Sequence, residues 1–82
     1  MVTVKFYGLI RSNHRIETMK VKPGTLREVI NQIQVEHPQI SDHEFLTAVV
    51  FINQTKVMHM NRLTVQVNEH DEIVFTNFVG GG

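Results

Sequence analysis

An amphipathic helix is predicted at Thr25-Leu26-Arg27-Glu28-Val29-Ile30-Asn31-Gln32-Ile33. Thr25 and Glu28 have the spacing of a capping box, in which each side chain satisfies a free backbone amide at the start of a helix. Pro38 ends the helix near Glu36 or His37, because proline disfavours helical geometry in the residue before it. The apolar residues recur at helical spacing and form one stripe, which needs a sheet to cover it: Leu26, Val29, Ile30 and Ile33.

Two strands are predicted before this helix. Val2 to Tyr7 alternates apolar and polar residues, and Ile16 to Val21 resumes the alternation less regularly. Gly8 to His14 interrupts the pattern with Gly, Ser and Asn, so it is predicted to be the loose turn of an antiparallel hairpin. Pro23-Gly24 ends the second strand.

The chain after the helix is predicted to be mostly β. Pro38 to Glu44 is expected to be a polar loop, and Phe45 to Ile52 is apolar enough to be an inner strand. Further strands are predicted at Lys56 to Met60, Leu63 to Asn68 and Ile73 to Phe78.

One helix among several strands predicts an α+β domain, in which a mixed sheet packs on the amphipathic helix. With the last strand beside the first, this is the β-grasp, or ubiquitin-like, arrangement. The expected domain covers residues 1–78 and is followed by a flexible glycine tail, residues 79–82.

Composition excludes several classes of protein. The 82 residues suffice for one domain, and eight basic residues balance eight acidic ones, so no net positive charge attracts nucleic acid. The absence of cysteine excludes disulfides, thiolate metal sites and a catalytic thiol. The longest apolar run, Ala48 to Ile52, is too short for a membrane span, and no charged-then-apolar leader precedes the first strand. We therefore expect a cytoplasmic protein without membrane contact.

The polar side chains predict no catalytic or metal site. Asp71 and Glu72 are adjacent and point apart, whereas an acid–base pair must converge in a cleft. Ser12 and Ser41 lack the context of a nucleophile elbow. The five histidines show neither helical pairing nor zinc-finger spacing, so no metal is expected: His14, His37, His43, His59 and His70.

The last three residues, Gly80-Gly81-Gly82, follow directly on an apolar strand. Glycines add nothing to a core and lose the most entropy on ordering, so this tail is predicted to be flexible. A peptide without Cβ atoms can thread a narrow channel, and Val79 to Gly82 reaches about 13 Å when extended. A carboxylate is a poor acyl donor, so chemistry at Gly82 requires activation, most simply to an acyl-adenylate.

Three segments and the glycine tail together carry a family resemblance. Val2 to Arg11 resembles a first strand running into an arginine, Ile52 to Val57 resembles a V-N-Q-x-x-V turn, and Asp71 to Phe75 resembles a D-E-V-x-F strand. These are features of MoaD and ThiS, the ubiquitin-like sulfur carriers that include the small subunit of molybdopterin synthase. The resemblance covers essentially the whole chain.

The chain departs from that family at three places. His70 stands where the family has the glycine of a D-G-D-E turn, and Met58 to Gln66 is a few residues longer. Thr76-Asn77-Phe78 replaces an aromatic residue and two prolines that molybdopterin-type members commonly carry.

The resemblance implies a non-enzymatic carrier of the molybdopterin-synthase type. Gly82 would be adenylated and then thiocarboxylated, Gly81 would be the required penultimate glycine, and Gly80 would occupy a small-residue position. ATP would be used by the activating partner, an adenylyltransferase of the ubiquitin-activating-enzyme-like class, and this chain would bind no cofactor. The sulfur would pass to the large subunit of molybdopterin synthase, in molybdenum cofactor biosynthesis, or to another sulfur-accepting enzyme.

A partner-binding patch is predicted beside the tail. Because Ile73 and Phe75 face the core, Val74 and Phe78 lie on the opposite face of the sheet, together with Tyr7. Such a patch would dock the partner and direct Val79 and the three glycines into it. The alternative is that these side chains cover a second, minor core.

Other functions stay open at this point. The carrier would otherwise deliver sulfur for thiamine or another thiolated product, or Gly82 would form isopeptide bonds to lysines, as in a ubiquitin-like modifier. A different class of protein is a β-grasp interaction module whose glycines are frayed and never activated.

Overall fold

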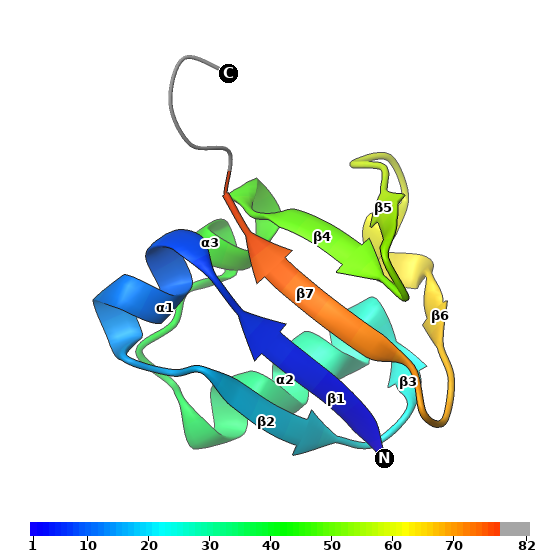
Figure 1. Cartoon of the computed structure of the whole chain (residues 1–82), viewed down its shortest axis with the longest axis horizontal. Coiled ribbons are helices and arrows are strands. Elements are labelled where there is room, and N and C mark those ends of the chain that lie inside the picture. Colours follow the sequence, from blue (N-terminus) through cyan, green and yellow to red (C-terminus); the bar gives the residue numbers. More distant parts are fainter. Residues whose placement is uncertain (78–82) are drawn as a thin grey trace.

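A five-stranded sheet forms one layer of the molecule and its helices form the other (Figure 1). The structure is a computed structural model that describes residues 1–77. The sheet has the order β2-β1-β7-β4-β5. Its strands are β1 (Val2–Phe6), β2 (Thr18–Val21), β4 (Val49–Ile52), β5 (Thr55–Val57) and β7 (Glu72–Thr76).

Three α-helices and a short 3-10 helix accompany the sheet within residues 1–77. They are α1 (Gly8–His14), α2 (Leu26–Glu36), α3 (Asp42–Thr47) and η1 (Arg62–Thr64). Two very short strands, β3 (Gly24–Thr25) and β6 (Gln66–Val67), pair with each other outside the main sheet. None of the described helices is long and apolar enough to cross a membrane.

The last strand lies in the centre of the sheet. β7 pairs in parallel with β1, with Val4 opposite Ile73, and antiparallel with β4, with Val50 opposite Phe75. The sheet is therefore mixed, and the last strand is beside the first. This confirms the predicted α+β class and β-grasp arrangement.

The core lies between the sheet and α2. Alternation along the strands buries the residues predicted to face inward, such as Val4 and Ile73, and the apolar stripe of α2 is buried against them. Phe75 anchors the centre, since its ring stacks on Phe6 at 5.8 Å and meets the edge of Phe45 at 5.2 Å between ring centroids. The capping box of Thr25 and Glu28 is present as predicted.

The segment Gly8–His14 is a helix, so the prediction of a loose turn is wrong. Its residues Arg11, Ser12 and Asn13 are exposed, whereas Ile10 is buried and joins the helix to the core. The helix ends at Arg15, which has left-handed backbone geometry with φ of 56° and donates its N–H to the carbonyl of Arg11. A single buried residue in a helix of seven is too weak a periodic signal to find by pattern alone.

The prediction of a strand from Phe45 to Ile52 is wrong in its first half. Asp42–Thr47 forms α3, which begins with a second capping box, between Ser41 and Glu44. Helical geometry turns Phe45 into the core, and the strand is limited to Val49–Ile52. The predicted polar loop therefore ends where α3 begins.

The segment after β4 also differs from the prediction. The strand expected at Lys56 to Met60 is only Thr55–Val57. The strand expected at Leu63 to Asn68 is replaced by η1 and the two-residue β6, which pairs with β3. The reason is Arg62, whose buried side chain fixes η1 against α3.

Two predictions concern the end of the chain. The final strand ends at Thr76, and the proposed boundary between a domain of residues 1–78 and a tail of residues 79–82 lies outside the described residues. His70 occupies the turn before β7 with a φ of 71°, the left-handed geometry that the family glycine would adopt easily.

Candidate functional site at the end of the central strand

The carboxyl end of β7 is fixed by both neighbouring strands. Thr76 lies opposite Val49 of β4, and on the other side the N–H of Tyr7 donates to the carbonyl oxygen of Phe75 at 2.8 Å. A central strand held on two sides gives the segment that follows it a fixed point of departure. Figure 1 shows this end of β7 at the opposite end of the sheet from the N-terminus.

Asn77, the last described residue, is packed against the start of α1. Its Oδ1 accepts a hydrogen bond from the N–H of Leu9 at 2.9 Å, which satisfies a free amide at the start of that helix. Gly8 makes the close approach possible, because a Cβ at this position would lie 2.6 Å from Asn77 Oδ1 and 2.9 Å from the Asn77 backbone nitrogen. Gly8 also has a φ of +70°, which favours glycine.

Five of the predicted site residues cannot be placed. Phe78, Val79, Gly80, Gly81 and Gly82 lie outside the described residues. The structure locates Tyr7 and Val74, the other two members of the predicted set, and the strand end from which the remaining five follow.

Val74 lies on the outer face of the sheet, opposite the buried residues Ile73 and Phe75 of the same strand. It is half-buried, and the strand register places it between Lys5 of β1 and Phe51 of β4. Tyr7 comes directly after β1 and is 44% exposed. Helices α1, α2 and α3 do not cover this face (Figure 1).

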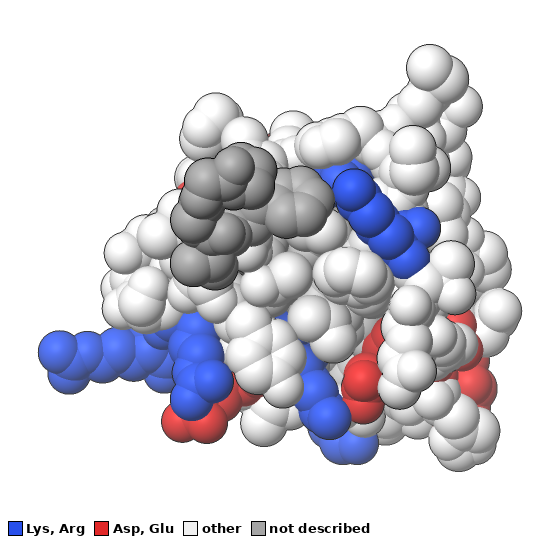
Figure 2. All heavy atoms as spheres, turned by 45° about the horizontal axis from the view of Figure 1, so that its top comes forward, with Lys and Arg blue, Asp and Glu red and all other residues white. Residues whose placement is uncertain are grey.

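Charged side chains surround the uncharged middle of this face. Lys5 Nζ lies 3.1 Å from a carboxylate oxygen of Glu72, and this hydrogen bond, followed by the charge of the same carboxylate, raises the pKa of Lys5. The guanidinium of Arg11 lies over the ring of Tyr7, 5.9 Å from its centroid. Figure 2 shows uncharged side chains in the middle, with Lys and Arg side chains on several sides.

Several of the polar residues considered from the sequence have structural partners. The hydroxyl of Ser12 donates to the carbonyl oxygen of Gly8, and Ser41 caps α3. The N–H of Asn68 and the side chain of Asn53 donate to Asp71, and they lower its pKa in that order. Within residues 1–77, no three His, Cys, Asp or Glu side chains are grouped to hold a metal ion.

Comparison with known protein families identifies the family of this chain. A search of curated proteins gave no match. The model of the ThiS family matches residues 4–82, nearly the whole chain. The chain belongs to the ThiS family. It is therefore a sulfur carrier, a non-catalytic protein, which confirms that part of the expectation drawn from the resemblance.

Solved structures similar to this ThiS-family chain have the same fold. SAMP1 of Haloferax volcanii is 16% identical with a TM-score of 0.77, over 99% of this chain and 98% of that one. A chain of the BexX/CysO complex of Amycolatopsis orientalis is 21% identical with a TM-score of 0.71, over 100% of both. A chain of the complex of subunits 1 and 2 of the molybdopterin-converting factor of Helicobacter pylori 26695 is 21% identical, with a TM-score of 0.69, over 99% and 97%.

Sequence reasoning missed two residues that hold the site of this ThiS-family chain. Gly8 was assigned to a turn, and Asn77 was considered only for its departure from the family pattern. Their contact joins residues 69 positions apart. The one local signal is a glycine directly before the apolar pair Leu9-Ile10, which is typical of many turns.

Proposed function

We propose that this ThiS-family carrier is of the molybdopterin-synthase type. A partner adenylyltransferase of the ubiquitin-activating-enzyme-like class activates the Gly82 carboxylate with ATP. The resulting thiocarboxylate donates its sulfur to the large subunit of molybdopterin synthase. In this proposal the chain binds no cofactor and supplies only the acyl terminus.

The observation that carries the proposal is the fixed end of β7. Asn77 is held by Gly8 and the N–H of Leu9, and Gly82 follows five residues later in the sequence. Extended, five residues reach about 17 Å. A rigid origin followed by Val79 and three glycines is the arrangement that delivers a carboxylate into a narrow site on another protein.

The chemistry at Gly82 follows from the poor leaving group of a carboxylate. Attack on ATP by a carboxylate oxygen forms the acyl-adenylate and releases pyrophosphate. A persulfide then attacks the acyl carbon and expels AMP, and reduction of the resulting S–S bond by a thiol leaves the thiocarboxylate. Each of these groups comes from partners, in agreement with the lack of cysteine in this chain.

We propose that the outer face of the sheet docks these partners. Val74 and Tyr7 offer apolar surface beside the end of β7, and Phe78 follows directly after Asn77 in the sequence. Contacts at Val74, Tyr7 and Phe78 would hold the partner while Val79, Gly80, Gly81 and Gly82 enter its site.

The resemblance of the sequence to MoaD and the likeness to a chain of the molybdopterin-converting factor support this assignment. A second candidate is transfer to another acceptor or to lysine side chains, as in thiamine synthesis or protein modification. It is favoured by the similar likeness to chains of the SAMP1 and BexX/CysO structures and by Thr76-Asn77-Phe78 in place of the usual prolines.

One experiment tests the activation step. The chain is incubated with the adenylyltransferase, ATP and a persulfide donor, and mass spectrometry follows replacement of one terminal oxygen by sulfur. A variant with one alanine appended after Gly82 should give no product, whereas a variant with an alanine inserted after Met1 should react normally. Product from the first variant would contradict activation at Gly82.

A second experiment separates the acceptors. The thiocarboxylated chain is mixed with the large subunit of molybdopterin synthase and its pterin substrate, and in parallel with a lysine-rich protein and the activating enzyme. Loss of sulfur to the pterin supports the proposal. Isopeptide conjugation without sulfur transfer to the pterin would favour the modifier.

A further inference from the structure

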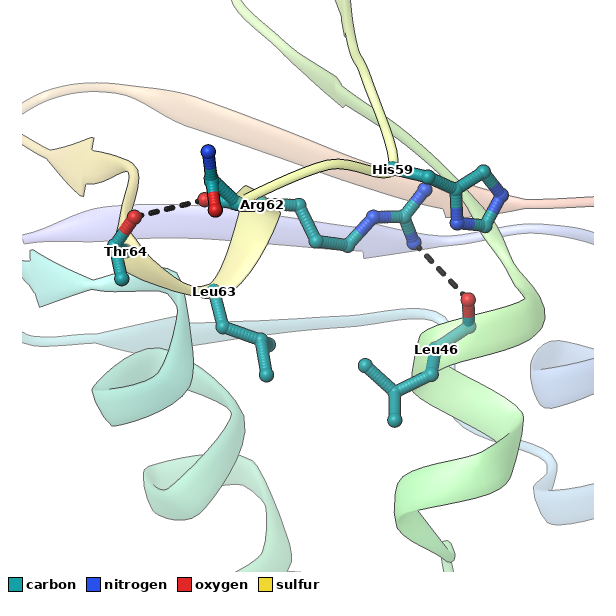
Figure 3. A pocket seen from close by; sticks show the side chains of 6 residues that line it. Leu46, His59, Arg62, Leu63 and Thr64 are labelled. Atoms are coloured by element: carbon teal, nitrogen blue, oxygen red, sulfur yellow. Dashed lines mark hydrogen bonds between the residues drawn. The ribbon is translucent and has the colours of Figure 1, made fainter.

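The segment Met58-His59-Met60 carries three side chains that can bind a metal ion, next to one another in the sequence. It follows directly on β5 and precedes η1. His59 also lines a hollow between α3 and η1, together with Leu46 and Arg62 (Figure 3). The sequence-based expectation of no metal rested on the spacing of the histidines and did not consider thioether ligands.

All three side chains are open to solvent. Met58 is 70% exposed and Met60 is 82% exposed, and His59 is exposed as well. Met19 packs against the core, whereas Met58 and Met60 do not, so packing does not account for two methionines here. Among the histidine rings of residues 1–77, the ring of His14 is the one that is hydrogen-bonded, so the ring nitrogens of His59 are available.

The backbone between β5 and η1 allows the three side chains to converge. A regular strand would point His59 away from the two methionines. The strand ends at Val57, however, and the N–H of Arg62 donates to the carbonyl oxygen of His59 at 3.3 Å, which closes a turn. The Cα atoms of Met58 and Met60 are at most about 7 Å apart. Because each methionine has three rotatable bonds, both sulfur atoms can reach one ion.

The ligand types select a soft, monovalent ion. Thioether sulfur selects Cu(I) and imidazole nitrogen suits copper, whereas Mg²⁺ and Ca²⁺ need oxygen ligands. The sequence has no Asp or Glu between Glu44 and Glu69, so this segment brings no carboxylate to balance the charge of a divalent ion. Arg62 lines the same hollow as His59, and its positive charge repels a divalent ion about twice as strongly as a monovalent one.

We propose that Met58, His59 and Met60 form a binding site for one Cu(I) ion. The ligands are two thioether sulfurs and one imidazole nitrogen, and all three are neutral. The site shares no residue with the outer face of the sheet that is proposed to dock the partners. The inference therefore does not depend on sulfur transfer.

Nuclear magnetic resonance of the full-length chain tests this site. The methionines carry ¹³C in their methyl groups, so that Met1, Met19, Met58 and Met60 are observed separately. The probes are tetrakis(acetonitrile)copper(I) under nitrogen and silver nitrate in a chloride-free buffer, since Ag(I) is a soft monovalent ion that is not oxidised by air. We expect the signals of Met58, Met60 and the His59 ring to shift together and to saturate at one ion per chain.

Met1 is the internal reference for an isolated thioether, because it is 51% exposed. Its methyl signal should not shift over the concentration range that saturates Met58 and Met60. Met19, which packs against the core, should not shift either. Zinc sulfate at the same concentrations should leave the methyl signals of all four methionines unchanged, because thioether sulfur is a poor ligand for Zn²⁺.

Leucine variants remove the sulfur and keep an apolar side chain of similar size. Met58→Leu and Met60→Leu should each weaken Cu(I) and Ag(I) binding at least about tenfold, and so should His59→Gln, since even the residues that orient metal ligands are worth about that much. Met1→Leu is the matched control and should bind as the wild type does. All four positions are exposed, so the melting temperatures should stay close to that of the wild type.

Four results would overturn the proposal. A Met1 signal that shifts together with those of Met58 and Met60 would show only the affinity of a single exposed thioether. Undiminished binding in Met58→Leu, Met60→Leu or His59→Gln would exclude the three-ligand site. Equal shifts with Zn²⁺ would show that the site is not soft, and absence of a saturable shift with Cu(I) would exclude it whatever Ag(I) does. Thiocarboxylate formation by the same variants without metal reports separately on the carrier function.

Discussion

At Gly8, a single hydrogen atom in place of a side chain allows α1 to meet the end of the central strand. A Cβ would approach Asn77 Oδ1 to 2.6 Å, and the φ of +70° is unfavourable for any residue with a side chain. We expect Gly8→Ala to lower the free energy of unfolding by about 2 kcal/mol or more, measured by urea denaturation. Thiocarboxylate formation should also slow, because the end of β7 is displaced.

Asn77→Ala provides the matched control for this residue. The single substitution Asn77→Ala removes the hydrogen bond from the N–H of Leu9. It should lower the free energy of unfolding by about 1 kcal/mol. The double variant Gly8→Ala, Asn77→Ala should lose less stability than the sum of the two single variants. The reason is that the new Cβ at position 8 no longer meets the Oδ1 of Asn77. A Gly8→Ala protein as stable as the wild type would contradict the packing described here.

At the scale of single elements, α3 depends on one carboxylate that serves two purposes. Glu44 accepts the N–H of Ser41 in the capping box and lies 2.7 Å from Nε2 of His14 in α1. The hydrogen bond from the Ser41 backbone lowers the pKa of Glu44 most, and His14 lowers it further. Glu44 therefore helps to hold α1 and α3 together.

The pH dependence of stability follows from that direction. A carboxyl group with a folded pKa below its unfolded value of about 4.3 contributes stability above that value, and loses it as pH falls through the folded pKa. We expect the urea concentration at the midpoint of unfolding to decrease when the pH is lowered below about 4. Asp42 and Asp71 should contribute to this decrease, because their pKa values are also lowered. Glu44→Gln should be less stable at neutral pH and should lose less on acidification.

Glu36→Gln is the control, because Glu36 is an exposed residue at the end of α2. Its urea midpoint should follow that of the wild type across the same range. If Glu44→Gln showed the full acid dependence of the wild type, the stabilising carboxylates would lie elsewhere.

The elements differ in how far local sequence determines them. The helix α2 was predictable because its capping box and its buried stripe agree. The capping box at Ser41 and Glu44 is an equally local signal for α3. The apolar run from Phe45 to Ile52 favoured a strand instead, so α3 was not predicted. For α1 and η1 the deciding contacts are distant in the chain: Asn77 with Leu9, and Arg62 with the carbonyl of Ala48. Neither contact leaves a pattern in the adjacent residues.

At the scale of the whole molecule, the sheet divides two surfaces with different predicted uses. The outer face carries Val74 and Tyr7 beside the end of β7, and the helix side carries the exposed Val35 of α2. The sequence predicted that the last strand lies beside the first, and the pairing of β7 with β1 confirms it. The pairing of β7 with β4 on its other side was not predicted. The proposed partner contacts of that face involve a second protein, so the order of elements in this chain does not predict them.

Matched substitutions on the two surfaces test the docking face. Val74→Lys places a charge in the middle of the outer face, between Lys5 and Phe51, and should raise the KM of the adenylyltransferase for this chain about tenfold or more. Val35→Lys makes the same change at a residue that is 82% exposed on α2, and should leave that KM unchanged. Because both side chains can extend into water, the two melting temperatures should differ little from the wild type. An equal loss of activation in both variants, or none in either, would exclude the outer face of the sheet as the surface that docks the activating enzyme.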